Sequence, residues 1–385
     1  MNKAIPRRTQ RPRRALALAT VLLVACSSSP ETGGTGGGGG TAMVPTTPTP
    51  APEGSPFPTL DEWHLFKDAR ALTPAEGVIP YDVNAPLFSD YTVKRRFLWL
   101  PRGTKIGWQD TERWNFPVGA IMIKTFAYPI DARDPAKGQR LLETRLLVHE
   151  SEPAGWVSHT YEWDAAQTGG KRKVAGDTLD VTWIDEQGTT KTNAYEVPNT
   201  NVCQECHGET GKTGTLGGRT RQLNRTYDYG KGPENQIDHL VALGLLDVAP
   251  PPLAQRQTLI DPSGTGDVGE RGRAYLDVNC SHCHGVVGLA KGTALRLDYD
   301  HTDPVKGNPT DYGVCKAPAS AGAGGTCGLS FDLVPGHSDQ SILVCRTDSI
   351  APKVTMPPVG HKLIHDEGVA LLKAWIDAMP EQLCQ

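Results

Sequence analysis

The strongest constraint on this chain is a short pattern that occurs twice: two cysteines three residues apart, followed directly by a histidine. The residues are Cys203, Cys206 and His207 in VCQECHG, and Cys280, Cys283 and His284 in NCSHCHG. With nine cysteines and eleven histidines in 385 residues, chance seldom produces the pattern even once. Its repetition predicts that both sites carry the same chemistry.

Three kinds of site use a Cys-x-x-Cys pair. Structural zinc commonly takes two pairs about 12 to 20 residues apart, and the two pairs here are separated much more widely. A thioredoxin-type dithiol expects a βαβ context and needs no adjacent histidine. A haem c attachment uses all three residues, because the thiols form thioethers with the vinyl groups and the imidazole ligates the iron. The sequence therefore predicts two covalently attached haem c groups, haem 1 at the first motif and haem 2 at the second.

The first residues predict export. Residues 1–25 combine a basic start with the apolar run ALALATVLLVA, which is too short to span a bilayer and is typical of a signal peptide. The run ends in LVAC, which resembles the lipobox of bacterial lipoproteins, so Cys26 is predicted to be lipidated; an ordinary secretory signal is the alternative. Residues 26–58 are mostly Gly, Ser, Thr, Pro and Ala, which predicts a disordered linker. Ser27 resembles outer-membrane sorting, so we expect a cell-envelope lipoprotein that faces the periplasm or the cell surface.

Export also places the remaining cysteines in an oxidising compartment. The four outside the lipobox and the two motifs are Cys315, Cys327, Cys345 and Cys384. Four cysteines allow three pairings. We favour Cys315–Cys327, which would close a Gly/Ala-rich loop, together with Cys345–Cys384. Free thiols are the alternative.

The fold class predicted is a multidomain α+β protein. Residues 59–198 contain the strand candidates RRFLWL, AIMIKTFAY, RLLETRLLVHE and GWVSHTYEW, and a hairpin signal in DTLDVTWID-EQG-TTKTNAYEV. They predict a β-rich, sandwich- or barrel-like domain. Residues 199–255 form a first haem-binding α region packed on that domain, with a helix in ENQIDHLVALGLL that uses Ile237, Leu240, Val241 and Gly244 as one face.

Residues 262–385 resemble a mono-haem c-type cytochrome domain, so we expect an all-α domain. GERGRAYLDVNC predicts a helix that leads into the second motif. HDEGVALLKAWIDAMP predicts the closing helix, with Asp366 as its N-cap. The expected apolar face of that helix is Val369, Leu372, Trp375, Ile376 and Met379. In cytochromes of this class the first and last helices cross beside the haem.

The distal ligand of haem 2 is predicted to be Met356. It lies in VTMPPVG, which resembles the distal-ligand loop of the same class, and the two prolines restrict the backbone that presents the thioether. His/Met ligation leaves no open iron position and suits electron transfer. Other histidines in this region are alternatives that are each more typical of solvated side chains: His282, His301, His337, His361 and His365.

Haem 1 has no comparable loop, and its sixth ligand stays open. His159 shares a strand face with Val157, Tyr161 and Trp163, which favours a core histidine. His239 lies off the apolar face of its helix, and Met122 lies in an apolar strand. An open or water-bound iron is the remaining possibility.

Over most of residues 60–385 the chain resembles a family of bacterial di-haem c-type cytochrome lipoproteins. PYDVNAPLFSDYTVKRRFLWLP, WNFPVGAIMIKTF, ETRLLVHE and the two motifs carry the resemblance, and similar segments extend exported PQQ-type sugar dehydrogenases. FPVGAIMIKTF also resembles cytochrome P460-like β domains. The resemblance implies haem binding and electron transfer and does not indicate a substrate.

Three functions compete. The first is an electron carrier in the cell envelope, with a periplasmic dehydrogenase or another cytochrome as its partner. The second is a peroxidase- or oxygenase-like enzyme with an open iron at haem 1, fed by haem 2. The third is a binding module whose β domain docks a partner. The formal net charge of −4 argues against a nucleic-acid binder. We favour the carrier over the catalyst and expect the membrane to be contacted through the lipid anchor only.

Overall fold

We describe the protein from a computed structural model, in which residues 47–209, 212–319 and 325–385 are described. The predicted signal peptide, the lipidation site Cys26 and most of the predicted linker lie outside these residues. Val44–Gln385 forms one compact unit. None of the helices in the described ranges is long and apolar enough to cross a membrane.

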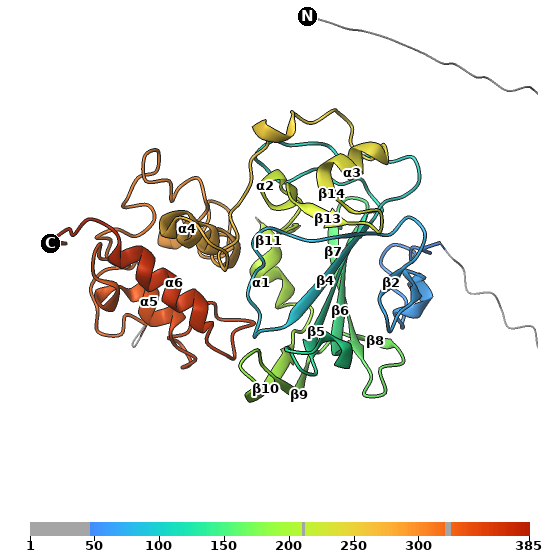
Figure 1. The fold of residues 1–385 in the computed structure, drawn as a ribbon, viewed down its shortest axis with the longest axis horizontal. Helices are drawn as coiled ribbons and strands as arrows, with labels where there is room; N and C mark the ends of the chain where they lie inside the picture. The colour runs from blue at the N-terminus through green and yellow to red at the C-terminus, as the bar shows by residue number, and fades with distance from the viewer. Residues whose placement is uncertain (1–46, 210–211, 320–324) are drawn as a thin grey trace, which may run out of the picture. The chain divides into compact units, whose positions relative to one another are not determined.

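A six-stranded antiparallel sheet organises the β-rich part (Figure 1). Its strands pair in chain order, so that each hydrogen-bonds to the next and β3 and β8 form the two edges. The strands are β3 (Ile79–Tyr81), β4 (Val93–Trp99), β5 (Ile121–Pro129), β6 (Gln139–His149), β7 (Trp156–Trp163) and β8 (Gly170–Lys173). The four predicted strand candidates correspond to β4 to β7, so the β-rich character is confirmed.

One face of this sheet packs on the N-terminal segment. Ile121, Ile123 and Leu146 are fully buried there beneath Leu60 and Trp63. The indole of Trp63 donates a 2.6 Å hydrogen bond to the hydroxyl of Tyr161, which satisfies two buried polar groups. The segment contains a short 3₁₀ helix, Asp61–Trp63, and the two-stranded sheet of β1 (Phe66–Asp68) and β2 (Thr73–Pro74).

The opposite face is apolar at its two ends and charged in the middle. At one end Met122 and Leu98 pack with Trp114 and Phe116. At the other end a hairpin covers Phe126, and this hairpin is β9 (Asp177–Ile184) paired with β10 (Thr190–Val197), as the sequence predicts. Between the two ends lie the basic side chains Lys94, Arg96, Lys124 and Arg145.

The segment that follows the hairpin contains little regular secondary structure. Its elements are α1 (Cys203–His207), β11 (Gly208–Glu209), β12 (Lys212–Thr213), α2 (Thr220–Leu223), β13 (Thr226–Asp228), β14 (Pro233–Asn235) and α3 (Gln236–Ala242). Ile237 and Leu240 of α3 are buried as predicted, but Val241 is exposed. Gly244 lies beyond the end of α3 at φ 70°, so the predicted helical face is shorter than expected.

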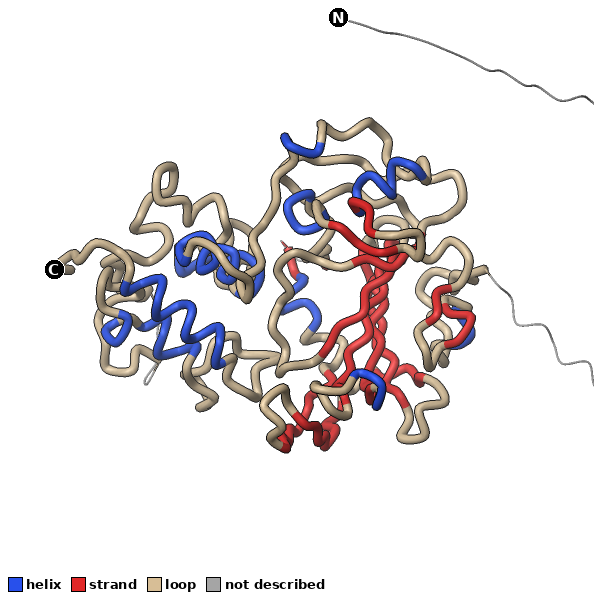
Figure 2. Tube along the Cα trace, in the orientation of Figure 1, coloured by secondary structure: helices blue, strands red, loops and turns tan. Residues whose placement is uncertain are grey.

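Residues 262–385 contain α4 (Val268–Asn279), α5 (Ile342–Thr347) and α6 (Asp366–Asp377), connected by long loops (Figure 2). An all-α domain is therefore not supported, since most of the segment is loop and two isolated bridges, Val314–Leu333 and Phe331–Ser341, link its parts. The predicted face of the closing helix is buried except at Met379, which lies beyond the end of α6 and is only partly buried. Asp366 is the first residue of the helix and not its N-cap, which is His365.

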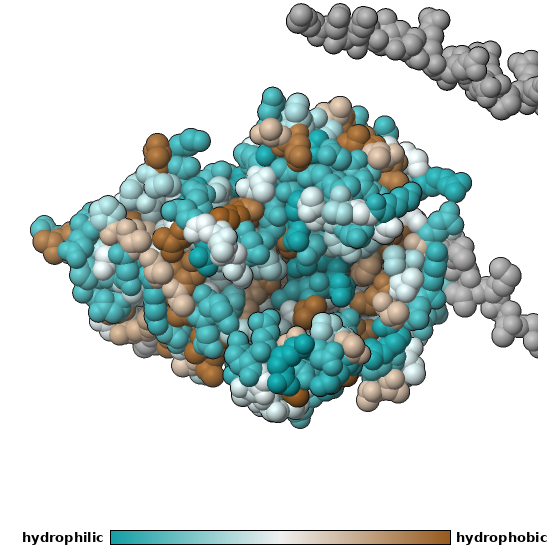
Figure 3. All heavy atoms as spheres, in the orientation of Figure 1, coloured by the Kyte–Doolittle hydropathy of each residue, from teal (hydrophilic) through white to brown (hydrophobic). Residues whose placement is uncertain are grey.

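Helices α4 and α6 pack directly on one another. A Cβ atom at Gly272 would lie 2.7 Å from Trp375, so only glycine allows this approach. Leu276 and Leu372 are fully buried in the cluster that the two helices share. The outer surface is mainly hydrophilic on the side drawn in Figure 3, where apolar residues occur in small separate groups.

The four remaining cysteines form two disulfides, but the pairing that we favoured is wrong. Cys315 pairs with Cys384 and Cys327 pairs with Cys345, with Cα–Cα distances of 5.0 and 6.6 Å. The amide of Gly336 donates to the carbonyl of Ile376, which binds the loop before α5 to the closing helix. The C-terminal tail thus passes Cys315, a long-range contact that spacing in the sequence does not reveal.

Peptide mapping without reduction should recover Cys315 linked to Cys384 and Cys327 linked to Cys345. The Cys315–Cys384 bond spans 69 residues and the other spans 18. Loop entropy predicts that removing the longer link by Cys315→Ser with Cys384→Ser costs about 4 kcal/mol of unfolding free energy, and the shorter about 3 kcal/mol. Urea unfolding measures both. A Cys315–Cys327 peptide would contradict the observed topology.

Candidate functional site

The first Cys-x-x-Cys-His motif forms the helix α1. The side chain of Asn199 accepts the amides of Asn201 and Val202 at 3.0 and 3.2 Å, which fixes the turn that leads into the helix. Within the helix, Cys203 and Cys206 are three residues apart and therefore lie on the same side. The sequence expectation of one helical turn that presents both thiols is met.

His207 is held in a defined tautomer. Its Nδ1 lies 2.9 Å from the carbonyl oxygen of Gly214, and the Gly214 amide donates back to the His207 carbonyl. A donor role for Nδ1 leaves Nε2 as the nitrogen with a free lone pair, which is the usual arrangement of a metal-ligating histidine. Burial lowers the pKa of His207 to about 4, so the imidazole is neutral near pH 7.

The second motif follows α4 as a single turn. The amides of Cys283 and His284 both donate to the carbonyl of Cys280, at 3.1 and 2.8 Å. Burial raises the pKa of the Cys280 thiol to about 12 and lowers that of His284 to about 4. This turn also holds the two sulfurs and the imidazole within five residues of chain.

A cavity of about 800 Å³, part of it open to solvent, joins the second motif to Met356. Its walls include both motif thiols, the imidazole and the thioether, with apolar side chains between them. They are Cys280, Cys283, His284, Met356, Leu295, Leu297, Ile342 and Leu343. The donor set fits a haem c held by two thioethers with a histidine and a methionine as axial ligands.

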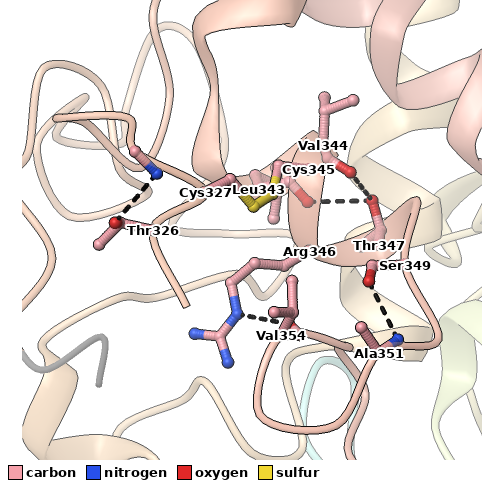
Figure 4. The surroundings of a disulfide bond; sticks show 11 residues. Thr326, Cys327, Leu343, Val344, Cys345, Arg346, Thr347, Ser349, Ala351 and Val354 are labelled. Carbon is pink, nitrogen blue, oxygen red and sulfur yellow. Dashed lines mark hydrogen bonds between the residues drawn. A yellow bond between two sulfur atoms is a disulfide. The ribbon is translucent and has the colours of Figure 1, made fainter. Parts of the chain in front are cut away.

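The loop that carries Met356 is fastened to the end of α5 (Figure 4). Nε of Arg346 donates to the carbonyl of Val354 at 2.9 Å. The amide of Met356 donates to the carbonyl of Arg346 at 2.9 Å. The neighbouring Cys345 is the residue disulfide-bonded to Cys327. Arg346 therefore holds the segment that leads to Met356 at two points, through its side chain and through its carbonyl group.

The two motifs touch each other. The thiol of Cys283 lies 3.4 Å from the carbonyl oxygen of Glu205 in α1. The thiol of Cys206 is adjacent to that of Cys283 and to the imidazole of His282, and these two neighbours lower its pKa. The thiol of Cys206, followed by burial, raises the pKa of Cys283. The two motifs, although far apart in the chain, are thus in direct contact in the fold.

Most of the other histidines near the second motif have side-chain partners away from the cavity. His301 binds the carboxylate of Asp298, and His361 lies 3.0 Å from the hydroxyl of Thr355. His365 stacks on Phe88 and binds the hydroxyl of Tyr275. His337 precedes a short 3₁₀ helix. Among these rivals, only His282 lines the cavity that holds Met356.

The candidates for the sixth ligand of haem 1 do not gather at His207. His159 pairs with Leu146 on the sheet face that packs on Trp63, whereas the cations that act on His207, Lys124 and Arg145, lie on the other face. His159 is thus a core histidine, as the strand pattern favours.

His239 and Met122 also have other roles. His239 stacks on Tyr229 and binds Glu234. Met122 packs in the apolar end of the charged face, where it lies 3.6 Å from a Cβ atom placed on Gly218. None of the candidates taken from the sequence therefore lies close enough to His207 to serve as the sixth ligand of the predicted haem 1.

Sequence reasoning missed the basic side chains around α1. Lys94 and Arg96 belong to the basic run of residues 94–96 at the start of β4, and Lys124 interrupts the mainly apolar strand β5. A lysine in the middle of an otherwise apolar strand was the available signal, because such a residue is seldom buried without a partner.

No protein-family model, curated protein or solved structure matches the chain. Within the described ranges, no group of three or more His, Cys, Asp and Glu side chains is arranged to hold a metal ion by itself.

The buried His159 should make stability depend on pH. Burial and, next, the nearby Arg172 lower its pKa from 6.5 to about 4, so the unfolded chain takes up a proton first as the pH falls. The contribution is complete above pH 6.5 and is lost towards pH 4, by about 2–3 kcal/mol at pH 4.5. Urea unfolding at pH 7.5 and 4.5 should show a smaller difference for His159→Gln than for the wild type. An unchanged difference would assign the effect to other groups.

Proposed function

We propose that the protein is an exported, lipid-anchored di-haem c-type cytochrome that relays electrons in the cell envelope. The observation that carries this proposal is the contact between the two Cys-x-x-Cys-His motifs, one of which faces Met356 across a cavity. Haem iron, when bound, supplies reversible one-electron chemistry. The membership in the di-haem cytochrome lipoprotein family that the sequence suggests is part of the proposal.

Each motif residue has a role in this proposal. The cysteine pairs would attach the two haems through thioethers, and His207 and His284 would be the proximal ligands. Met356 would close the second iron, since a thioether fixed by Arg346 exchanges poorly with solvent or added ligands. Attachment at the neighbouring Cys206 and Cys283 would place the haems at adjacent points, which suits electron exchange because tunnelling weakens steeply with distance.

Two further features support the proposal. The tether after α4, the Met356 loop before α6 and the close packing of α4 on α6 agree with a class I-like cytochrome c unit in residues 262–385. The two disulfides suit an oxidising compartment and therefore an exported protein. The partners would be redox proteins such as a periplasmic dehydrogenase or another cytochrome.

An enzyme with an open iron at haem 1 is the alternative. It is favoured by the positions of His159 and His239, since the first lies on the far face of the sheet and the second is engaged by Tyr229 and Glu234. In that case the Met356 haem would feed electrons to the open one, and the chemistry would be of the peroxidase or oxygenase kind.

A redox titration of the mature protein, with optical and EPR spectra in the presence and absence of CO, separates the two functions. Two low-spin haems, neither of which binds CO, would support the electron carrier. One high-spin haem that binds CO supports the enzyme. A protein purified after haem maturation without covalent haem would overturn both.

Met356→Ala should open the second iron. The loss of the thioether should lower the reduction potential of haem 2 and create CO binding, because His/Met ligation favours the reduced iron and fills the sixth position. Met379→Ala is the matched control, since Met379 follows the end of α6 and packs against the core of the same segment but does not line the cavity. Unchanged spectra and potential in Met356→Ala would contradict the assigned ligand.

A further inference from the structure

Four basic side chains from three adjacent strands share the centre of one sheet face. Arg96 of β4, Lys124 of β5 and Arg145 of β6 are direct cross-strand neighbours, and Lys94 lies two residues before Arg96. Like charges directly opposite one another destabilise a sheet. The arrangement therefore needs a compensating negative charge.

The protein supplies only part of that charge. The carboxylate of Glu143 binds Arg145 at 2.5 and 2.8 Å, and Asp82 binds Arg96 at 2.8 Å. Among the described residues, Lys94 and Lys124 form no ion pair; the ammonium of Lys124 lies 4.8 Å from the ring centroid of Phe126. The two lysines are thus the members of the cluster without a direct ion pair, and the carboxylates that act on them from farther away are Asp90 for Lys94 and Glu143 for Lys124.

Both lysines are crowded by protein atoms but keep some solvent contact, as expected for the wall of a recess. Burial, followed by the neighbouring Arg96, lowers the pKa of Lys94 to about 7, and burial lowers that of Lys124 as well. An ammonium in such a place is costly without an anion. Lys94 and Arg96 also line a recess that is open to solvent, with a volume of about 820 Å³ that includes this open space.

The cluster lies next to the first motif. Lys124 and Arg145 are the two cations that act on His207, and Arg145 also interacts electrostatically with Cys203. The short strand β12, which packs on α1, contacts β7 of the same sheet. The apolar ends of this face are covered by other segments, so its charged centre is the part that remains beside α1.

We propose that Lys94 and Lys124 bind carboxylate groups beside α1, and that these are the propionates of the haem attached at Cys203 and Cys206. This inference rests on the proposed function. A free small carboxylate in the adjoining cavity is the other source of the same chemistry, and the experiment distinguishes the two.

The test is a potentiometric titration of mature full-length Lys124→Gln and Lys94→Gln, with the haem content established by mass. A cation beside a haem stabilises the reduced form, so each substitution should lower the potential of haem 1 and leave haem 2 unchanged. We expect a threefold to tenfold change in the equilibrium constant for electron exchange between the haems, of which tenfold is about 59 mV. Comparison with Met356→Ala identifies which wave belongs to haem 2.

Two further variants serve as controls. Lys67→Gln removes an exposed lysine from β1, away from the charged face, and should leave both potentials unchanged. Lys124→Arg keeps the charge and should stay close to the wild-type potential. If Lys124→Gln does not fold, Lys94→Gln carries the same expected sign.

Several outcomes would overturn the assignment. A change in the reduction potential of haem 1 no larger than that in Lys67→Gln, or an equal change at both haems, would rule out propionate binding by these lysines. Succinate, titrated calorimetrically into the wild type and the two variants, is the probe for a free carboxylate. Succinate binding by the wild type that is lost in both variants, with unchanged potentials, would assign the lysines to a free carboxylate. A wild-type protein with haem at Cys280 and Cys283 but none at Cys203 and Cys206 would overturn the proposed function together with this inference.

Discussion

The register of β4, β5 and β6 is the constraint on which the first half of the structure depends. Successive side chains of a strand point to opposite faces, so a slip of one residue would exchange the two faces completely. In the observed register, Ile123 and Leu146 face the apolar core, whereas Lys124 and Arg145 face α1. The same pairing therefore builds the core and decides what surrounds the first motif.

A second constraint fixes the other motif. The loop with Met356 lies far along the chain from His284, yet Arg346 binds this loop through both its side chain and its carbonyl group. The disulfide of Cys345 with Cys327 and the burial of α5 hold that arginine in place. The cavity between the motif and the methionine is thus shaped by Arg346, which itself lines the cavity and is held by contacts outside it.

The contact between Cys206 and Cys283 connects the two halves. For the proposed electron carrier this contact matters because it brings two haem attachment points, which are far apart in the chain, directly next to each other. The proposed propionate site, in contrast, is formed by the sheet alone and would change the reduction potential of only one haem. Separate elements would then control distance and potential.

The sequence by itself determined which residues the proposed haem attachment uses, because each motif is local and five consecutive residues hold both thiols and the imidazole. It also determined the β-rich character, the β9–β10 hairpin and the buried face of α6, which follow from periodicity. The disulfide partners, the contact between the motifs and the cluster around Lys124 depend on residues distant in the chain. Only the tertiary structure decided these, because long-range pairing leaves no periodic trace in the sequence.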